Sequence, residues 1–264
     1  MPTADSDVVR AADVSLKQRL EDAQNRLYWF LRDRLAPGLE NSQAVYVAKL
    51  RDLLCADRRW LDLGCGRHLC HSWMTRTQRA LEVPRFAVGV DGDRAALADN
   101  TDLRLRVCAD VHALPFGNAT FDVITANMVL EHIAHPDVLL DEINRVLKPG
   151  GCFVVHTPNR RGYTTLLTRL IPQWLRASFA GLLHSRQSAD VYPTFYRANT
   201  VTSLSHLAGA CGLTLSDVEF VESSAQLSRI APLLVLEFVV IRLLRRGSLA
   251  RFRPCLLVTF QKHA

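Results

Sequence analysis

The chain has 264 residues, of which 48% are hydrophobic and 22% are charged, and its formal net charge is +6. This length predicts one domain, or one domain with a substantial insertion, and the composition excludes a disordered chain. The seven cysteines are scattered and form no CxxC pair, which favours reduced thiols over a disulfide framework. The first fifteen residues lack a basic start followed by an apolar stretch, so we expect a cytoplasmic protein without a secretory signal.

The N-terminal region is helical in pattern and predicts a cap on the domain that follows. Apolar residues recur at three- and four-residue steps, Pro37 and Gly38 interrupt the pattern, and residues 42–54 resume it as a second helix. No glycine-rich linker separates this region from the next. We therefore divide the chain into a helical cap, residues 1–58, and a main domain, residues 59–264.

In the next hundred residues, short apolar runs alternate with helical patterns. The runs that we predict as strands are 59–63, 85–90, 103–108, 121–126 and 152–157. The helices that we predict between them are 72–80, 93–100 and 136–147, with a turn at 148–151. This alternation is typical of a parallel sheet that helices cover on both faces.

The last part of the chain follows a different pattern. Residues 158–198 are irregular with helical patches, and residues 200–211 predict a helix that Gly212 ends. Two late strands are predicted at 213–220 and 253–261. Such a pair is suited to extend a parallel sheet with antiparallel strands.

The first predicted strand runs into a glycine loop, in the stretch WLDLGCGRHLC. Gly64 and Gly66 let backbone approach a ligand closely, but a dinucleotide fingerprint requires a third glycine where this chain has Leu69. The P-loop pattern is also absent, so a pyrophosphate ligand and a nicotinamide-dependent oxidoreductase are disfavoured. The cysteines and histidines of the loop fit no zinc spacing, and we predict no metal site.

Three acidic residues lie in or just after the predicted strands. A carboxylate at Asp62 repels phosphate and accepts hydrogen bonds from an ammonium group, and one at Asp91 suits two ribose hydroxyls in an open α/β sheet. Asp110 is placed to accept from an exocyclic amine. Together they predict a cationic, sugar-bearing ligand with an amino-purine and no phosphate. Capping of a turn or a helix is the alternative role of Asp62 and Asp91.

Four segments, DLGCGRH, GVDGD, ADVHALPFGNATFDVITANMVLEHI and LKPGGCFVVHTPN, occur in this order over about residues 58–160. Together they resemble the class I S-adenosylmethionine-dependent methyltransferases, in the broad group related to the quinone-biosynthesis enzymes. The resemblance implies a Rossmann-like α/β fold with a seven-stranded, mostly parallel sheet and a reversed final strand. It also implies S-adenosylmethionine as the cofactor and acceptor-side insertions at about 158–198 and 224–248.

The same resemblance assigns cofactor contacts residue by residue. The positions are Asp62, Gly64 and Gly66 for the methionine end, Asp91 and Gly92 for the ribose, Asp110 and Val111 for the adenine, and Asn127 for the methyl-bearing part. The family usually has a glycine at position 68, where this chain has His68. Whether Arg67 and His68 touch the methionine end or only close the turn therefore stays open.

The acceptor side offers candidates for catalysis, since an oxygen or carbon acceptor can require a base. They are His132, His156, Tyr192 and Tyr196, and packing is the alternative for each. No Asn-Pro-Pro-aromatic motif follows the fourth strand and no aromatic and basic stripe is present, so we expect no nucleic acid partner. We predict methyl transfer to a small hydrophobic acceptor, quinone-like, lipid-like or another natural product. The alternative is a non-catalytic protein that binds the cofactor or a partner.

One late segment suggests a further partner. Residues 230–247 join a strongly apolar run to Arg242, Arg245 and Arg246. The run is interrupted by Glu237 and is shorter than the roughly 20 residues that span a bilayer. Apolar surface bordered by arginines is typical of an interfacial helix, so we expect peripheral membrane contact here. A helix that covers the sheet, or one that forms a homodimer interface, is the alternative.

Overall fold

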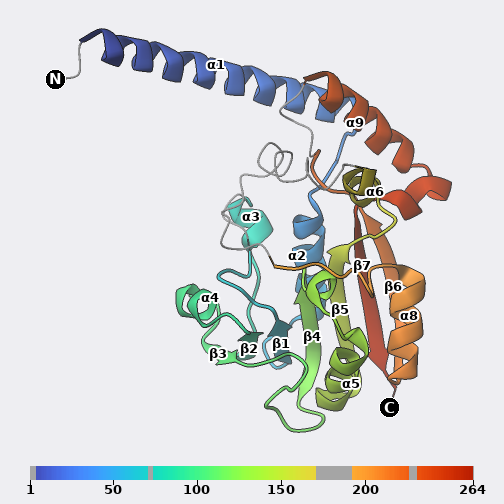
Figure 1. The fold of residues 1–264 in the computed structure, drawn as a ribbon. Helices are drawn as coiled ribbons and strands as arrows, with labels where there is room; N and C mark the ends of the chain where they lie inside the picture. Colours follow the sequence, from blue (N-terminus) through green and yellow to red (C-terminus); the bar gives the residue numbers. More distant parts are fainter. Residues whose placement is uncertain (1–3, 71–73, 171–191, 226–230, 264) are drawn as a thin grey trace. The chain divides into compact units, whose positions relative to one another are not determined.

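The computed structural model describes residues 4–70, 74–170, 192–225 and 231–263 (Figure 1). The chain divides into two compact units. The helical unit contains the described parts of Met1–Leu39 and Ser224–Ala250. The sheet unit contains the described residues of the remaining chain and holds every candidate site residue named above.

The sheet unit is built on seven strands in the order β3-β2-β1-β4-β5-β7-β6 (Figure 1). They are β1 (Arg59–Leu63), β2 (Phe86–Asp91), β3 (Leu105–Cys108), β4 (Phe121–Asn127), β5 (Leu147–Pro158), β6 (Leu213–Val221) and β7 (Cys255–Lys262). The pairs among β1 to β5 are parallel, whereas β7 is antiparallel to both β5 and β6. The predicted seven-stranded sheet with a reversed final strand is therefore confirmed, and the reversed strand lies inside the sheet while β6 forms its edge.

Helices cover both faces of this sheet, as predicted. Those of the sheet unit are α2 (Ser42–Leu53), α3 (Arg76–Arg79), α4 (Arg94–Asp99), η1 (Leu130–His132), α5 (Pro136–Val146), α6 (Tyr163–Leu170) and α8 (Val201–Ala210). Successive side chains of a strand point to opposite faces. Accordingly, Leu61 and Leu63 of β1 join the core that α5 and α8 complete, whereas Trp60 joins the core that α2 and α4 complete.

Two local predictions were wrong in detail. The helix predicted at 72–80 is described only from Arg76 to Arg79, because Thr75 caps its N-terminus through a hydrogen bond from the Gln78 amide; residues 71–73 lie outside the described part. The turn predicted at 148–151 is an irregular stretch within β5, where Gly150 has a φ of +75° and the register against β4 shifts. The predicted segment 158–198 contains α6, and its residues 171–191 lie outside the described part.

The helical unit pairs α1 (Ala4–Leu35) with α9 (Ala231–Leu244), and η3 (Gly247–Phe252) follows α9 in the chain. The ring of Tyr28 meets that of Phe238 edge-on with 5.4 Å between centroids. Arg245 Nη1 donates to the carbonyl of Pro37 at 2.6 Å. None of the helices in the described part of the chain has a stretch both long and apolar enough to span a bilayer.

Gly89 of β2 tests how closely the glycine loop packs on the sheet. A Cβ at Gly89 would lie 2.6 Å from both Cys65 Sγ and Leu103 Cδ1. Gly89→Ala should therefore lower the free energy of unfolding by about 1–3 kcal/mol, the usual scale of overpacking. Urea unfolding followed by circular dichroism measures this change.

The matched control is Gly209 in α8, where an added Cβ meets nothing within 4 Å. Gly209→Ala should raise the free energy of unfolding, by up to about 1 kcal/mol, because alanine favours the helical backbone. Equal effects of the two substitutions would contradict the packing described for Gly89.

Candidate functional site

The loop after β1 contains two glycines with different structural roles. Gly64 and Gly66 have φ values of +62° and +52°, in the region that favours glycine. A Cβ at Gly64 would lie 2.4 Å from Val129 Cγ2, whereas one at Gly66 would meet nothing within 4 Å. Gly64 is thus required by packing against the chain after β4, and Gly66 borders open space.

Asp91, the last residue of β2, ties this loop to the neighbouring strand. Its Oδ2 accepts the backbone N–H of Gly66 at 2.9 Å, and its Oδ1 accepts that of Asp93 at 2.8 Å. Each carboxylate oxygen has two lone pairs, so both keep an acceptor position for a ligand. Beside them, a Cβ at Gly92 would meet nothing within 4 Å. The position predicted for the ribose therefore combines a fixed carboxylate with room for a diol.

Asn100 is a loop contact that our sequence reasoning missed. Its side chain is completely buried, and its Nδ2 donates to the carbonyl of Gly66 at 2.8 Å. Its Oδ1 accepts the backbone N–H groups of Asp102 and Leu103, each at 3.1 Å. The residue stands at the end of a predicted helix, which gives no signal for a contact to a loop 34 positions earlier.

Arg67 and His68 turn toward acids that follow in the chain. The guanidinium of Arg67 pairs with Asp99. His68 is 59% exposed with its Nδ1 4.0 Å from Asp102 Oδ2, and the same carboxylate accepts the backbone N–H of Leu69 at 2.9 Å. These contacts support the second of the two roles left open above, in which the pair closes the turn.

Asp62 of β1 is a buried carboxylate with one oxygen engaged. Thr125 Oγ1 donates to its Oδ1 at 2.6 Å and accepts from Trp60 Nε1 at 2.8 Å. Its Oδ2 has no hydrogen-bond partner among the described residues. Burial raises the pKa of Asp62 to about 7, the Thr125 hydrogen bond opposes the rise, and the charge of Asp91 adds to it. A cationic ligand group at Oδ2 would offset the cost of this buried charge.

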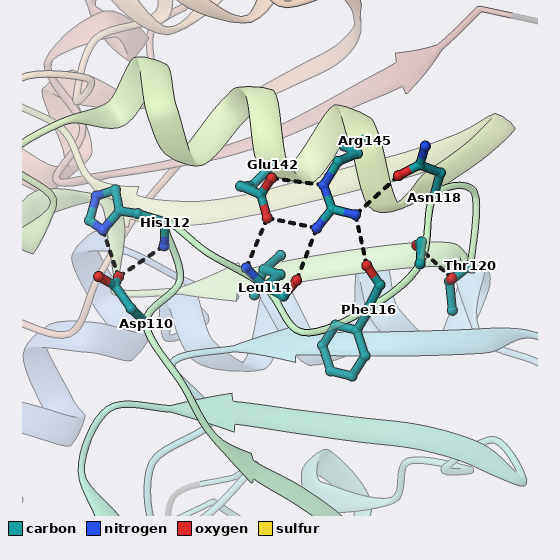
Figure 2. Close-up of polar contacts among 9 residues, drawn as sticks. Asp110, His112, Leu114, Phe116, Asn118, Thr120, Glu142 and Arg145 are labelled. Atoms are coloured by element: carbon teal, nitrogen blue, oxygen red, sulfur yellow. Dashed lines mark hydrogen bonds and ion pairs between the residues drawn. The ribbon is translucent and has the colours of Figure 1, made fainter.

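Asp110 and Val111 begin the long loop that leads from β3 to β4. Asp110 Oδ1 accepts the backbone N–H of His112 at 2.9 Å and lies 2.7 Å from His112 Nδ1 (Figure 2). Hydrogen bonds from the backbone and then the ring of His112 lower the pKa of Asp110, which is exposed and ionised. Both contacts with His112 use Oδ1, so Oδ2 of Asp110 keeps its acceptor positions for an exocyclic amine.

Two residues of α5 hold this loop in place, and both were missed by our sequence reasoning. Arg145 donates to the carbonyls of Leu114 at 2.9 Å and Phe116 at 2.7 Å, and Glu142 Oε2 accepts the Leu114 N–H at 2.8 Å (Figure 2). Glu142 and Arg145 also form an ion pair at 2.8 Å. The sequence shows Glu142 and Arg145 as helix neighbours three positions apart. Their hydrogen bonds to the loop are tertiary contacts, for which the sequence gives no signal.

Asn127 and His156 belong to a polar group beneath α2. Asn127 Nδ2 donates to Gln43 Oε1 at 2.8 Å, and its Oδ1 lies 2.8 Å from His156 Nδ1. His156 is completely buried and stacks on the ring of Tyr46 with 5.5 Å between centroids. The structure therefore gives His156 a packed environment, and it adds Gln43 and Tyr46 of the predicted cap to the surroundings of the site.

The segment that holds Tyr192 and Tyr196 contacts the chain after β4 at Glu131 and His132. His132 Nδ1 lies 2.8 Å from the carbonyl oxygen of Pro193, and its ring meets that of Tyr192 edge-on with 5.9 Å between centroids. A carbonyl only accepts, so Nδ1 carries the proton in this contact. The backbone of Tyr196, with a φ of +52°, donates to the carbonyl of Glu131 at 3.3 Å.

The predicted cofactor contacts lie at or just after the carboxyl ends of β1, β2, β3 and β4, which share one edge of the parallel sheet. Ligands of open α/β sheets bind at this edge. The acceptors at the edge, Asp62, Asp91 and Asp110, suit an ammonium group, a ribose and an amino-purine, and open space borders Gly66 and Gly92. These carboxylate acceptors fit S-adenosylmethionine and disfavour a phosphate.

Comparison with known proteins agrees with the cofactor that these residues indicate. A family model described as a methyltransferase domain matches residues 31–215. A demethylmenaquinone methyltransferase of Clavibacter sepedonicus is 32% identical over 161 residues, which cover 58% of this chain and 63% of the relative. A ubiquinone biosynthesis O-methyltransferase of Psychrobacter arcticus is 33% identical over 131 residues, which cover 46% and 50%. The match thus spans less than two thirds of either relative.

Solved structures share the fold at lower identity. A Listeria monocytogenes protein assigned as an S-adenosylmethionine-dependent methyltransferase has a TM-score of 0.53 at 15% identity, covering 84% of this chain and 99% of its own. The cyclase SpnF has a TM-score of 0.50 at 18% identity, covering 90% and 94%. At these identities the likeness concerns the fold alone.

The raised pKa of Asp62 makes stability depend on pH. The neutral form is favoured in the folded chain, so its contribution is full below the ordinary pKa of 3.8 and is lost as pH rises through about 7. Asp62→Asn removes this titration. As pH rises from about 5 to about 8, the free energy of unfolding of the variant should rise by about 2–3 kcal/mol relative to that of the unchanged protein. Urea unfolding of both proteins across this range tests the sign, and a constant difference would contradict it.

Proposed function

Because the chain belongs to the methyltransferase domain family, the class I S-adenosylmethionine-dependent enzymes related to quinone-biosynthesis methyltransferases, we propose that it methylates a small hydrophobic acceptor at oxygen or carbon. The observation that carries the proposal is the set of three carboxylates at one edge of the sheet, Asp62, Asp91 and Asp110, with room beside Gly66 and Gly92.

S-adenosylmethionine supplies a methyl group that the positive charge on its sulfur already activates. The chain therefore has to bind the donor and the acceptor, orient them toward each other and exclude water. Asp62 would hold the ammonium group, Asp91 the ribose hydroxyls, and Asp110 with the backbone of Val111 the adenine. Asn127, fixed by Gln43 and His156, would border the methyl-bearing part.

His132 is the best-placed candidate base for a hydroxyl acceptor. The contact of Nδ1 with Pro193 leaves Nε2 of the neutral ring with a lone pair, which can accept a proton. His132 is also 30% exposed, whereas His156 is completely buried. Tyr192 and Tyr196 would border the acceptor beside His132.

A hydrophobic acceptor is supported by apolar side chains on the surface of the sheet unit. Leu166 and Leu167 of α6 are 41% and 46% exposed, and Phe195 is 45% exposed. The relatives named above are a demethylmenaquinone and a ubiquinone biosynthesis methyltransferase, which favours a quinone-like compound among the hydrophobic acceptors.

A non-catalytic role is the second candidate. It is favoured by the internal partners of both histidines, since each has Nδ1 in contact with a protein oxygen. Incubation with methyl-labelled S-adenosylmethionine and a panel of prenylated quinols, phenols and acyl compounds separates the two. Label transfer to any of them supports the enzyme, and binding without transfer to any supports the second candidate.

The ribose assignment predicts the effect of one substitution. Asp91→Ala removes the acceptor and releases the Gly66 and Asp93 amides, so it should weaken S-adenosylmethionine binding by about 1–3 kcal/mol, or roughly 5- to 150-fold. Calorimetry measures the affinity. Asp57→Ala, which removes an exposed acid outside the site, is the control for charge. Equal affinities of the two variants for S-adenosylmethionine would contradict the assignment of Asp91 to the ribose.

We also propose that α9 contacts an anionic bilayer. The face of α9 opposite its buried residues exposes Val235, Leu236, Val239 and Leu243 to between 39% and 58%. The exposed Arg242 lies in the last turn of α9, and the exposed Arg246 follows the helix. The acid of this helix, Glu237, lies on the buried face. Apolar residues bordered by cations complement a negatively charged lipid surface.

Co-sedimentation with vesicles tests this surface. The unchanged protein should bind vesicles with about 30% phosphatidylserine more tightly than neutral ones, because each arginine near the surface adds about 1 kcal/mol. The double substitution Leu236→Ser with Val239→Ser should reduce binding to both kinds of vesicle. The double substitution Arg242→Ala with Arg246→Ala should remove the preference for anionic vesicles. Binding unaffected by either pair would refute the proposal. Self-association that only the apolar pair abolishes would support the homodimer alternative instead.

A further inference from the structure

Residues 192–196, here called the strap, are attached to the chain that follows β4. Pro193 contacts His132 Nδ1 through its carbonyl oxygen at 2.8 Å. Phe195 donates its backbone N–H to the carbonyl of Glu131 at 2.7 Å, and Tyr196 donates to the same carbonyl at 3.3 Å. These backbone contacts give the strap a firm attachment at η1.

The strap also reaches the chain that follows β2. The hydroxyl of Tyr192 donates to Asp93 Oδ2 at 3.2 Å. The other oxygen of Asp93 caps α4 by accepting the backbone N–H groups of Ala95 at 2.8 Å and Ala96 at 3.1 Å. Capping and the contact with Tyr192 therefore use separate oxygens, and a substitution can remove one without the other.

The sheet order places the glycine loop between these two attachments. β1 lies between β2 and β4, so a segment joined to the chain after both neighbours passes across the carboxyl end of β1. Figure 1 shows the chain before α8 running across the ends of the strands. Gly64 and Gly66 begin the loop at this end of β1.

The two attachments differ in kind. Backbone groups hold the strap at η1, whereas the contact described on the β2 side is made by a side-chain hydroxyl with an exposed carboxylate. Tyr192 itself is 50% exposed. An exposed hydrogen bond contributes little to global stability, so the bond between Tyr192 and Asp93 can break at low cost.

We propose that Tyr192 is a positioning residue that closes the strap over the bound cofactor through its hydrogen bond to Asp93. Opening at the β2 side admits the cofactor next to Asp91, and closing retains it and completes the acceptor side next to His132. The inference rests on the proposed function in one respect, the binding of S-adenosylmethionine or its product at the glycine loop.

Dissociation of the product, S-adenosylhomocysteine, measured by stopped flow tests the inference without an acceptor. Tyr192→Phe keeps the ring and removes the hydroxyl, so dissociation should become about 3-fold faster, the scale of one exposed hydrogen bond. The melting temperature of the ligand-free protein should not change. Tyr28→Phe, on α1 in the helical unit, is the matched control and should leave the dissociation rate unchanged.

Asp93→Ser gives a second, independent variant. Serine retains the N-cap of α4 and lacks the second carboxylate oxygen, so it should speed dissociation as much as Tyr192→Phe does. Combining the two should add nothing further, because both remove the same hydrogen bond.

Trypsin cleavage after Arg197 gives a readout of the strap itself, since this exposed residue directly follows it. S-adenosylhomocysteine should slow cleavage at Arg197 several-fold in the unchanged protein and less in Tyr192→Phe. Equal dissociation and equal protection in the two proteins would overturn the inference alone. Failure of the unchanged protein to bind S-adenosylhomocysteine would overturn the proposed function along with it.

Discussion

The carboxylate of Asp91 is the constraint on which the rest of the site depends. One oxygen holds the Gly66 amide and the other holds the Asp93 amide, so a single side chain fixes the loop after β1 and the turn into α4. Asn100 secures the same loop from the opposite direction through the Gly66 carbonyl. With both backbone groups of Gly66 bonded, the glycine can leave its Cα face open to a ligand without becoming mobile.

Fixing the loop in this way determines the charge that a ligand must carry. Asp62 is buried behind the loop, and burial raises its pKa to about 7. Asp91 lies close enough to add to that rise, so the site has a local excess of negative charge. A phosphate would increase this excess, whereas an ammonium and a sulfonium group relieve it. The electrostatics and the missing third glycine thus lead to the same class of cofactor.

The sequence predicted the strands well, and it placed three acids in or just after them, because both features depend on local pattern. Apolar runs of five or six residues identified β1, β2 and β4, and an acid at a strand end is visible without knowledge of the fold. Contacts between distant positions had no such signal. Examples are Asn127 with Gln43, 84 positions apart, and Tyr192 with Asp93, 99 positions apart. The helix predicted at 72–80 was too long because its capping threonine was not recognised.

Calorimetric titration of the unchanged protein with S-adenosylmethionine, S-adenosylhomocysteine and NAD tests whether the site takes a cationic nucleoside without phosphate. We expect one-to-one binding of both sulfur ligands and no binding of NAD. Because Asp62 must ionise to hold the ammonium group, we also expect proton release on binding below about pH 7. Binding of NAD, or no binding of either sulfur ligand, would contradict the assignment of this site.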